Sequence, residues 1–280
     1  MAKRIDVDIS NLENMSKTIG IIGIGAIAEA VVIGLCKKAE SPKKILLSPR
    51  NKQRAEQLAK RFSNVEIARD NQAVISASDI VFLAVRPQVV EDVLRELSFK
   101  AEQRVVSIIS GYPIKQLEGL IEPTKHIVRM IPLPAIARHE GPILMSPPSQ
   151  EIAKLFQEMG SLAQVEQEDQ LEILCAVTGL MAPYFGLLDQ CVDWLSTNGI
   201  DESKAFDFVG ALFEVLGHTP RDSTEKDFSK VAKEHATPQG FNEQALRELT
   251  KIGWYGDVSE VLDLLSRRLA GKARFEDGVK

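Results

Sequence analysis

Short runs of β-branched and other apolar residues alternate, from Thr18 onward, with stretches in which apolar residues recur at helical spacing. The runs typical of strands are 18–24, 43–48, 65–68, 80–85, 105–109, 126–133, 141–147 and 162–167, and the stretches typical of helices among them are 26–39, 51–62, 87–97, 113–121 and 150–159. Strands separated by helices of about ten or more residues predict a parallel sheet with right-handed crossovers. The runs 80–85 and 105–109 show no polar alternation, which indicates strands buried on both faces.

The pattern changes after Pro147-Pro148, and beyond about residue 168 it predicts helices only. Residues 172–199 are typical of one long helix that ends at Gly199, with apolar residues on nearly every side. We expect this helix to be buried, against a second copy of the chain. Shorter helices are predicted at 202–217, 224–234, 242–253 and 258–270. The pattern therefore predicts a short arm at 1–16, an α/β domain at 17–166 and an all-helical domain at 167–280.

The residues Gly23-Ile24-Gly25-Ala26-Ile27-Ala28 match the pattern G-x-G-x-x-A between the first strand and the first helix. In dinucleotide-binding folds the first glycine makes a tight turn, the second admits the pyrophosphate, and the small third residue lets helix and strand pack closely. The helix N-terminus then offers N–H groups to the phosphates. This context favours a Rossmann-type doubly wound parallel sheet over the alternative, a glycine turn in a purely structural unit.

The end of the second predicted strand indicates which dinucleotide is bound. NAD enzymes usually carry Asp or Glu about 20 residues after the glycines, to hold the ribose 2′-hydroxyl. Here the residues are Ser48-Pro49-Arg50-Asn51, followed by Lys52 and Arg54, with no acid among them. Ser48 can donate to a 2′-phosphate, and Arg50 can bind it with two hydrogen bonds. We therefore expect NADP(H) rather than NAD; the alternative is that these cations belong to the solvated start of a helix.

Composition excludes several other classes of function. The chain is 44% hydrophobic and 26% charged, which is enough to build a sizeable core. Its net charge of −5 offers no basic surplus for nucleic acid. It has neither a signal-peptide pattern nor an apolar run of the roughly 18–20 residues that span a bilayer. Cys36, Cys175 and Cys191 are odd in number and far apart, so we expect reduced thiols and a cytoplasmic protein without membrane or nucleic-acid partners.

Several segments, in the right order, resemble one enzyme family, the pyrroline-5-carboxylate reductases. These segments are Gly20–Leu35, Ser78–Gln88, Ile108–Gly111, Val128–Pro132, Ala176–Tyr184 and Thr237–Gly240. The resemblance implies an NADP-binding Rossmann domain, a helical dimerisation domain and reduction of a C=N bond. It also implies cofactor contacts at Asn71, Val85, Arg86 and Pro87. It further implies a homodimer or higher homo-oligomer, in which one subunit completes the site of another.

The chain departs from the family where the substrate binds. Leu133 stands in place of a polar pair near the nicotinamide, and the loop Thr237-Pro238-Gln239-Gly240-Phe241-Asn242 replaces the family's S-P-G-G-T-T. In the family that loop binds the substrate carboxylate through backbone N–H groups and hydroxyls. Phe241-Asn242 keeps an N–H nest but makes the pocket narrower and more apolar. We therefore expect a related imine or carbonyl reductase more than a proline-forming enzyme.

Tyr184, Thr178, Thr237 and Asn242 are the polar residues that we expect around the substrate. An imine that is protonated in solution needs no strong protein acid, although His139 could supply a proton. Tyr184 could instead be a buried tyrosine bonded to a carbonyl. We predict no metal site, since no metal-binding motif is present. Two hypotheses follow: an NADPH-dependent reductase of a cyclic imine such as pyrroline-5-carboxylate or a related small imino or oxo acid, or a catalytically silent NADP-binding sensor.

Overall fold

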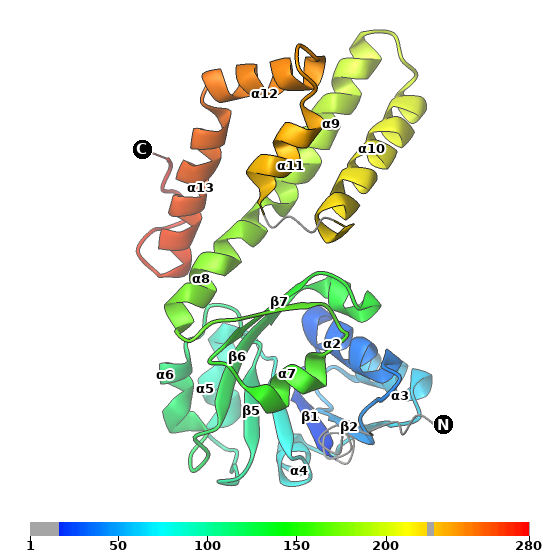
Figure 1. Ribbon diagram of the computed structural model, residues 1–280. Helices are drawn as coiled ribbons and strands as arrows, with labels where there is room; N and C mark the ends of the chain where they lie inside the picture. The colour runs from blue at the N-terminus through cyan, green and yellow to red at the C-terminus, as the bar shows by residue number, and fades with distance from the viewer. Residues whose placement is uncertain (1–16, 223–226, 280) are drawn as a thin grey trace, which may run out of the picture. The chain divides into compact units, whose positions relative to one another are not determined.

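The computed structural model describes residues 17–222 and 227–279, which form parts of two compact units, residues 1–174 and 175–280 (Figure 1). The N-terminal arm predicted at 1–16 lies outside the described residues.

The first unit is built on one sheet of eight strands in the order β3-β2-β1-β4-β5-β6-β7-β8. The strands are β1 (Thr18–Ile22), β2 (Lys44–Leu47), β3 (Val65–Ile67), β4 (Ile80–Leu83), β5 (Arg104–Ser107), β6 (Ile127–Pro132), β7 (Pro142–Ser146) and β8 (Ser161–Gln164). Strands β1 to β6 are parallel, as the pattern predicted, and reproduce the order of dinucleotide-binding sheets. Strand β7 is antiparallel to β6, because the connection through η3 (Pro134–Arg138) is too short for a crossover.

Helices cover both faces of this sheet. The helical segments of this unit are α2 (Ala26–Lys37), α3 (Lys52–Arg61), α4 (Asn71–Ser76), η1 (Pro87–Val89), α5 (Val90–Leu94), α6 (Ile114–Leu117), η2 (Glu118–Leu120) and α7 (Gln150–Phe156). Alternate strand residues point to opposite faces, so that Phe82 packs with α2, α3 and α7, whereas Val81 packs with α4, α5 and α6. The result is a three-layer α/β unit, which confirms the predicted fold class.

Two predicted helices, 87–97 and 113–121, are shorter in the structure and divided into segments, and a third helix, α4, was not predicted. The structure places only 87–94 and 114–120 in helix, in segments of three to five residues each. The six-residue helix α4 was missed because it is too short to show a helical period. Its N-cap could have been recognised: the Asp70 carboxylate accepts the Ala73 N–H at 2.7 Å.

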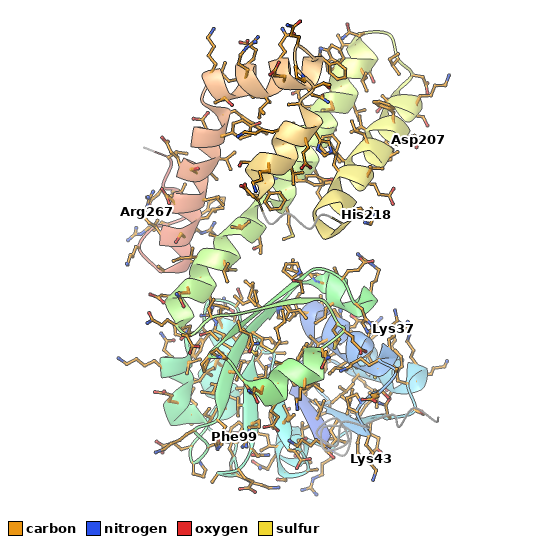
Figure 2. The ribbon with its side chains drawn as sticks, viewed as in Figure 1. Lys37, Lys43, Phe99, Asp207, His218 and Arg267 are labelled. Carbon is orange, nitrogen blue, oxygen red and sulfur yellow. The ribbon has the colours of Figure 1, made fainter. Side chains whose placement is uncertain are left out.

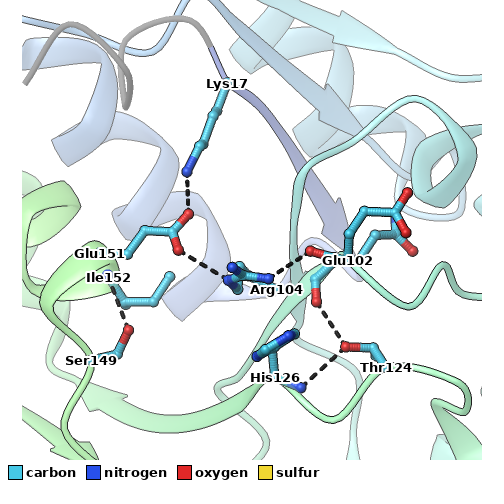
Figure 3. Close-up of polar contacts among 9 residues, drawn as sticks. Lys17, Glu102, Arg104, Thr124, His126, Ser149, Glu151 and Ile152 are labelled. Atoms are coloured by element: carbon cyan, nitrogen blue, oxygen red, sulfur yellow. Dashed lines mark hydrogen bonds and ion pairs between the residues drawn. The ribbon is translucent and has the colours of Figure 1, made fainter. Parts of the chain in front are cut away.

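A network of charges ties the amino-terminal edge of the sheet to α7 (Figure 3). The Glu151 carboxylate pairs with Lys17, just before β1, and with Arg104 at the start of β5, where the distance to Nε is 3.0 Å. Burial raises the pKa of Glu151, but Lys17 and Arg104 outweigh this effect and hold it below its usual value. Arg104 also donates to the Glu102 carbonyl at 2.6 Å.

A buried arginine joins the sheet to the start of α8 (Glu168–Val177). The guanidinium of Arg129, on β6, is 2% exposed and donates to Glu168 at 2.7 Å and to Glu172 at 2.6 Å. Burial by itself lowers the pKa of Arg129, but the two carboxylates raise it above its ordinary value. Glu168 also accepts the Ile114 N–H at 3.1 Å, so that the same acid contacts α6. The first two turns of α8 are therefore anchored to the α/β unit.

The second unit consists of helices in its described part. They are the end of α8, η4 (Thr178–Leu180), α9 (Met181–Thr197), α10 (Glu202–Asp222), α11 (Phe228–His235), α12 (Phe241–Lys251) and α13 (Trp254–Leu269). The long helix predicted at 172–199 is thus interrupted by one 3₁₀ turn. Polar side chains such as Asp207 and Arg267 are exposed (Figure 2), but so are many large apolar ones. Among the described residues beyond 174, the buried apolar side chains are only Ala176, Ala205 and Val209.

One segment, Glu168–Thr197, is long and apolar enough by length and composition to cross a membrane. Its mean hydropathy is 1.7 in the relevant window, of which 11% is buried. The same segment carries Glu168 and Glu172, the two acids that bind Arg129.

Candidate functional site

The glycine turn between β1 and α2 provides space for a ligand at one position and close contact at the other. Gly23 has φ +93, and a Cβ placed on it would lie 2.7 Å from the carbonyl oxygen of Ala84. It therefore has to be glycine for two reasons, its backbone angle and its contact with the segment after β4. A Cβ on Gly25 would meet no atom within 4 Å. The open space lies beside the N-terminus of α2, where unpaired N–H groups can bind an anion.

Two residues after β2 hold this turn in place. The Ser48 hydroxyl is buried, with the residue 1% exposed, and accepts the Gly23 N–H at 2.9 Å. The Asn51 amide donates to the Ile24 carbonyl at 2.9 Å, and its oxygen caps α3 by accepting the Arg54 N–H. The sequence predicted contact with a 2′-phosphate for Ser48. The structure shows that its oxygen accepts a bond inside the turn, which leaves the hydroxyl proton to donate, so that contact with a 2′-phosphate stays a prediction.

A cleft of about 490 Å³ opens above the turn, where β1 and β4 lie side by side and the chain passes to opposite sides of the sheet. The residues that line it are Gly23, Ile24, Gly25, Arg50, Asn51, Lys52, Ala84, Val85, Arg86 and Val89. Doubly wound sheets bind their ligands at such a switch point, outside the carboxyl ends of the strands. The cleft thus brings together the glycine turn, the residues after β2 and the residues after β4.

The charge of the cleft is positive. Arg50, Lys52 and Arg86 are its charged residues, and no carboxylate is among the described residues that line it. Neither Arg50 nor Arg86 forms an ion pair within the described part of the chain, so their guanidinium groups are available to an anionic ligand. Arg54 is not available in this way, because it pairs with Glu29 on α2. Sequence reasoning did not select Lys52, although its place at the first position of α3, two residues after Arg50, was the signal for it.

The remaining predicted cofactor residues lie around this cleft in different ways. Ala26 begins α2 and is exposed, Ile27 is half-buried and Ala28 is 2% exposed, as close packing of helix on strand requires. Val85 and Arg86 line the cleft, and Pro87 begins η1 directly after them. Asn71 begins α4 and is half-buried, but it is not among the residues that line the cleft.

The four predicted substrate residues all lie in the second unit. Thr178 is half-buried and donates to the Cys175 carbonyl at 2.7 Å, whereas Tyr184 is 42% exposed and contacts Phe185 and Phe213 edge to face. Tyr184 is therefore not a tyrosine buried in the unit. Thr237 lies in the exposed loop between α11 and α12, and Asn242 lies in the first turn of α12.

His139 has a structural contact. Its Nε2 lies 2.8 Å from the carbonyl oxygen of Gly34, one of the last four carbonyls of α2 and therefore without a partner inside the helix. Across residues 17–222 and 227–279 the structure contains no group of three or more His, Cys, Asp or Glu side chains that could hold a metal ion.

Comparison with known proteins finds similarity both around this site and along most of the chain. The model of the family described as NADP oxidoreductase, coenzyme F420-dependent, matches residues 18–111, which include the glycine turn and the residues after β2 and β4. The pyrroline-5-carboxylate reductase of Corynebacterium melassecola is 27% identical over 252 residues, which cover 85% of this chain and 92% of that protein. The chain is thus similar over most of its length to pyrroline-5-carboxylate reductases.

Solved structures of the pyrroline-5-carboxylate reductase family share the fold. The enzyme from Coxiella burnetii superposes with a TM-score of 0.82 at 20% identity, covering 93% of this chain and 100% of that one. The Plasmodium falciparum enzyme, solved with NADP bound, superposes with a TM-score of 0.74 at 17% identity, covering 93% of this chain and 99% of that one. The likeness covers more than nine-tenths of this chain and shows that the fold is shared.

Proposed function

We propose that the protein reduces the C=N bond of a small cyclic imine, with NADPH as the hydride donor. The observation that carries the proposal is the cleft at the switch point between β1 and β4. It combines an open glycine turn at a helix N-terminus with Arg50 and Arg86, which form no ion pair in the described chain. Similarity to a family of C=N reductases supports the reaction class. Pyrroline-5-carboxylate and related small imino or oxo acids are the reference compounds for identifying the substrate.

The basic residues of the cleft favour NADP(H) over NAD(H). The residues present fit a phosphorylated dinucleotide: Gly25 leaves room for a pyrophosphate, and Arg50 and Lys52 stand where a 2′-phosphate would need counter-charges. A carboxylate, which would bind the 2′-hydroxyl of NAD, is not among the described residues of the cleft. The NADP-bound relative supports the same preference.

The protein groups would bind and orient rather than perform covalent chemistry. When bound, the reduced nicotinamide supplies a hydride to the electrophilic carbon of the imine. The chain has to hold the substrate in a water-poor pocket, and Tyr184, Thr178, Thr237 and Asn242 are the polar groups that we assign to this task. A protonated imine already carries its proton, so that no strong acid is required at the site.

The protein acts, in this proposal, as a cytoplasmic homodimer or higher homo-oligomer. Few apolar side chains of the second unit are buried within one chain, and contact with a second copy would remove the exposed ones from water. A groove of about 750 Å³ between α9 and α10, lined in part by Phe185, Phe206 and Val209, is the apolar surface that a second copy would fill. The family resemblance adds that the loop 237–242 of one chain reaches the cofactor of the other.

Turnover distinguishes this proposal from a silent NADP-binding sensor. The test is the loss of NADPH absorbance in the presence of a panel of cyclic imines and oxo acids. Oxidation above the background rate with at least one compound supports the reductase. Tight NADPH binding without oxidation of any compound would instead leave the sensor as the function.

A further inference from the structure

Two backbone N–H groups of the loop between α11 and α12 donate hydrogen bonds within the chain. The Gln239 N–H donates to Oε2 of Glu243 at 2.8 Å, and the Gly240 N–H donates to the Thr237 carbonyl at 2.8 Å. Gln239 has φ +63, a left-handed conformation that is uncommon outside glycine and is fixed here by the Glu243 contact. The two N–H groups are thus already bonded within the chain.

The side chain of Asn242 also donates a hydrogen bond within the chain. Its amide nitrogen donates to the His235 carbonyl at 3.2 Å, which ties the first turn of α12 to the end of α11. One N–H group of the loop, that of Gln239, therefore already binds a carboxylate of the protein itself, that of Glu243.

The carboxylate of Glu243 has no cationic side chain as a partner in the described ranges. It is exposed and forms no ion pair with any residue of the described ranges. It lies in the first turn of α12, where it offsets the positive end of the helix dipole. Phe241, which is 83% exposed, is the adjacent side chain and adds apolar surface. The loop thus presents a negative charge and an aromatic ring.

We propose that Glu243 is a specificity-determining residue and selects cyclic imines without a ring carboxylate. The inference rests on the proposed function, which assigns the loop 237–242 to the substrate. A ring carboxylate would meet the Glu243 charge and find the N–H groups of Gln239 and Gly240 occupied, which costs binding free energy. A protonated imine that has no carboxylate carries one positive charge, and the same residue attracts it.

The experiment compares 1-pyrroline with 1-pyrroline-5-carboxylate, two imines that differ by the carboxylate alone. Steady-state kcat and KM are measured with NADPH for the full chain and for Glu243→Gln. Glutamine removes the charge but keeps an oxygen that accepts the Gln239 N–H, so that the loop is preserved. The matched control is Glu248→Gln, which removes a carboxylate from the exposed face of the same helix.

We expect the unmodified protein to have the higher kcat/KM with 1-pyrroline. Glu243→Gln should raise kcat/KM for the carboxylated imine by up to roughly fivefold, mainly through KM, since about 1 kcal/mol is a usual limit for an exposed charge pair. Glu248→Gln should leave the ratio of the two substrates unchanged. A wild-type preference for the carboxylated imine, or an equal change for both imines in Glu243→Gln, would overturn the inference and leave the reductase standing. No NADPH oxidation with either imine or with the wider panel would overturn the proposed function and the inference together.

Discussion

At the scale of single residues, Gly23 and Gly25 belong to the same turn, yet an added side chain meets different surroundings at the two positions. At Gly23 it would meet the Ala84 carbonyl and a backbone with φ +93, whereas at Gly25 it would project into open space. One glycine is therefore required by the fold and the other by a ligand.

Substitution by valine separates these two roles. Gly25→Val should unfold in urea within about 0.5 kcal/mol of the unmodified protein, because no neighbouring atom is displaced. It should bind NADPH at least ~100-fold more weakly in calorimetric titration, since the side chain fills the space beside the helix N-terminus. The control Gly23→Val should lose about 1–3 kcal/mol of unfolding free energy through backbone strain. Unchanged NADPH affinity in Gly25→Val would make the turn a structural feature only.

Arg50 provides the second test at this scale. Arg50→Ala should weaken NADPH binding by about 10- to 150-fold, which corresponds to roughly 1.5–3 kcal/mol for a lost charge-assisted contact. NADH, which lacks the 2′-phosphate, should lose little affinity. Fluorescence titration of both cofactors measures the ratio, and Arg69→Ala is the control because Arg69 is an exposed arginine after β3. Equal losses for the two cofactors would exclude Arg50 from the 2′-phosphate site.

At the scale of elements, residues far apart in sequence meet at Glu151. This residue lies in the first turn of α7 and joins the segment before β1 to the start of β5 (Figure 3). No sequence period reports such a contact, because the partners are separated by 134 and 47 residues.

The Glu151 network should make stability depend on pH. The folded state holds the pKa of Glu151 below its ordinary value of 4.5, so its carboxylate contributes stability that is present above that value and is lost as the pH falls through the folded pKa. Glu151→Gln should therefore reduce the unfolding free energy at neutral pH by about 1 kcal/mol. The difference from the unmodified protein should shrink below pH ~4.5, when urea unfolding is followed in a pH series. A difference that stays constant down to pH ~3 would contradict the assignment.

The elements themselves differ in how well the sequence predicted them. Strands β1 to β6 were located within a few residues, because buried parallel strands are continuous apolar runs. The antiparallel direction of β7 and the short helix α4 were not predicted. The first depends on the length of a connection, and the second is too short for a period. Gly179, in the 3₁₀ turn Thr178–Leu180, allows α13 to approach closely, since a Cβ at this position would lie 2.5 Å from Leu265 Cδ1.

At the scale of the whole molecule, the two units are unequally buried. The α/β unit contains two hydrophobic clusters, whereas the described part of the helical unit buries only three apolar side chains. In the helical unit, the side chains of Phe185, Phe206 and Phe208 are each more than 60% exposed. A free monomer would carry these side chains in water, which favours association.

Assembly is tested by the molar mass in solution. Light scattering over a dilution series should give a dimer or a higher oligomer into the nanomolar range, and Phe206→Asp, in the groove between α9 and α10, should shift the mass toward a monomer and reduce activity. The control is Phe275→Asp, equally exposed but in the segment after α13. A fully active monomer would contradict the proposal. A monomer that co-floats with neutral phosphatidylcholine vesicles would instead assign the apolar segment Glu168–Thr197 to a membrane.

The amino-acid sequence determined the local elements, the glycine turn and the basic character of the cofactor segment, because each depends on periodicity or on neighbours within a few residues. It also indicated the family, since the quoted segments occur in a fixed order. Tertiary structure decided which groups are free to bind. It showed the Ser48 oxygen bonded to the Gly23 N–H, Arg54 paired with Glu29, and the N–H groups of Gln239 and Gly240 bonded to Glu243 and Thr237. Residue type states what a side chain is able to bind, but only the folded chain shows whether a partner within the protein has already bound it.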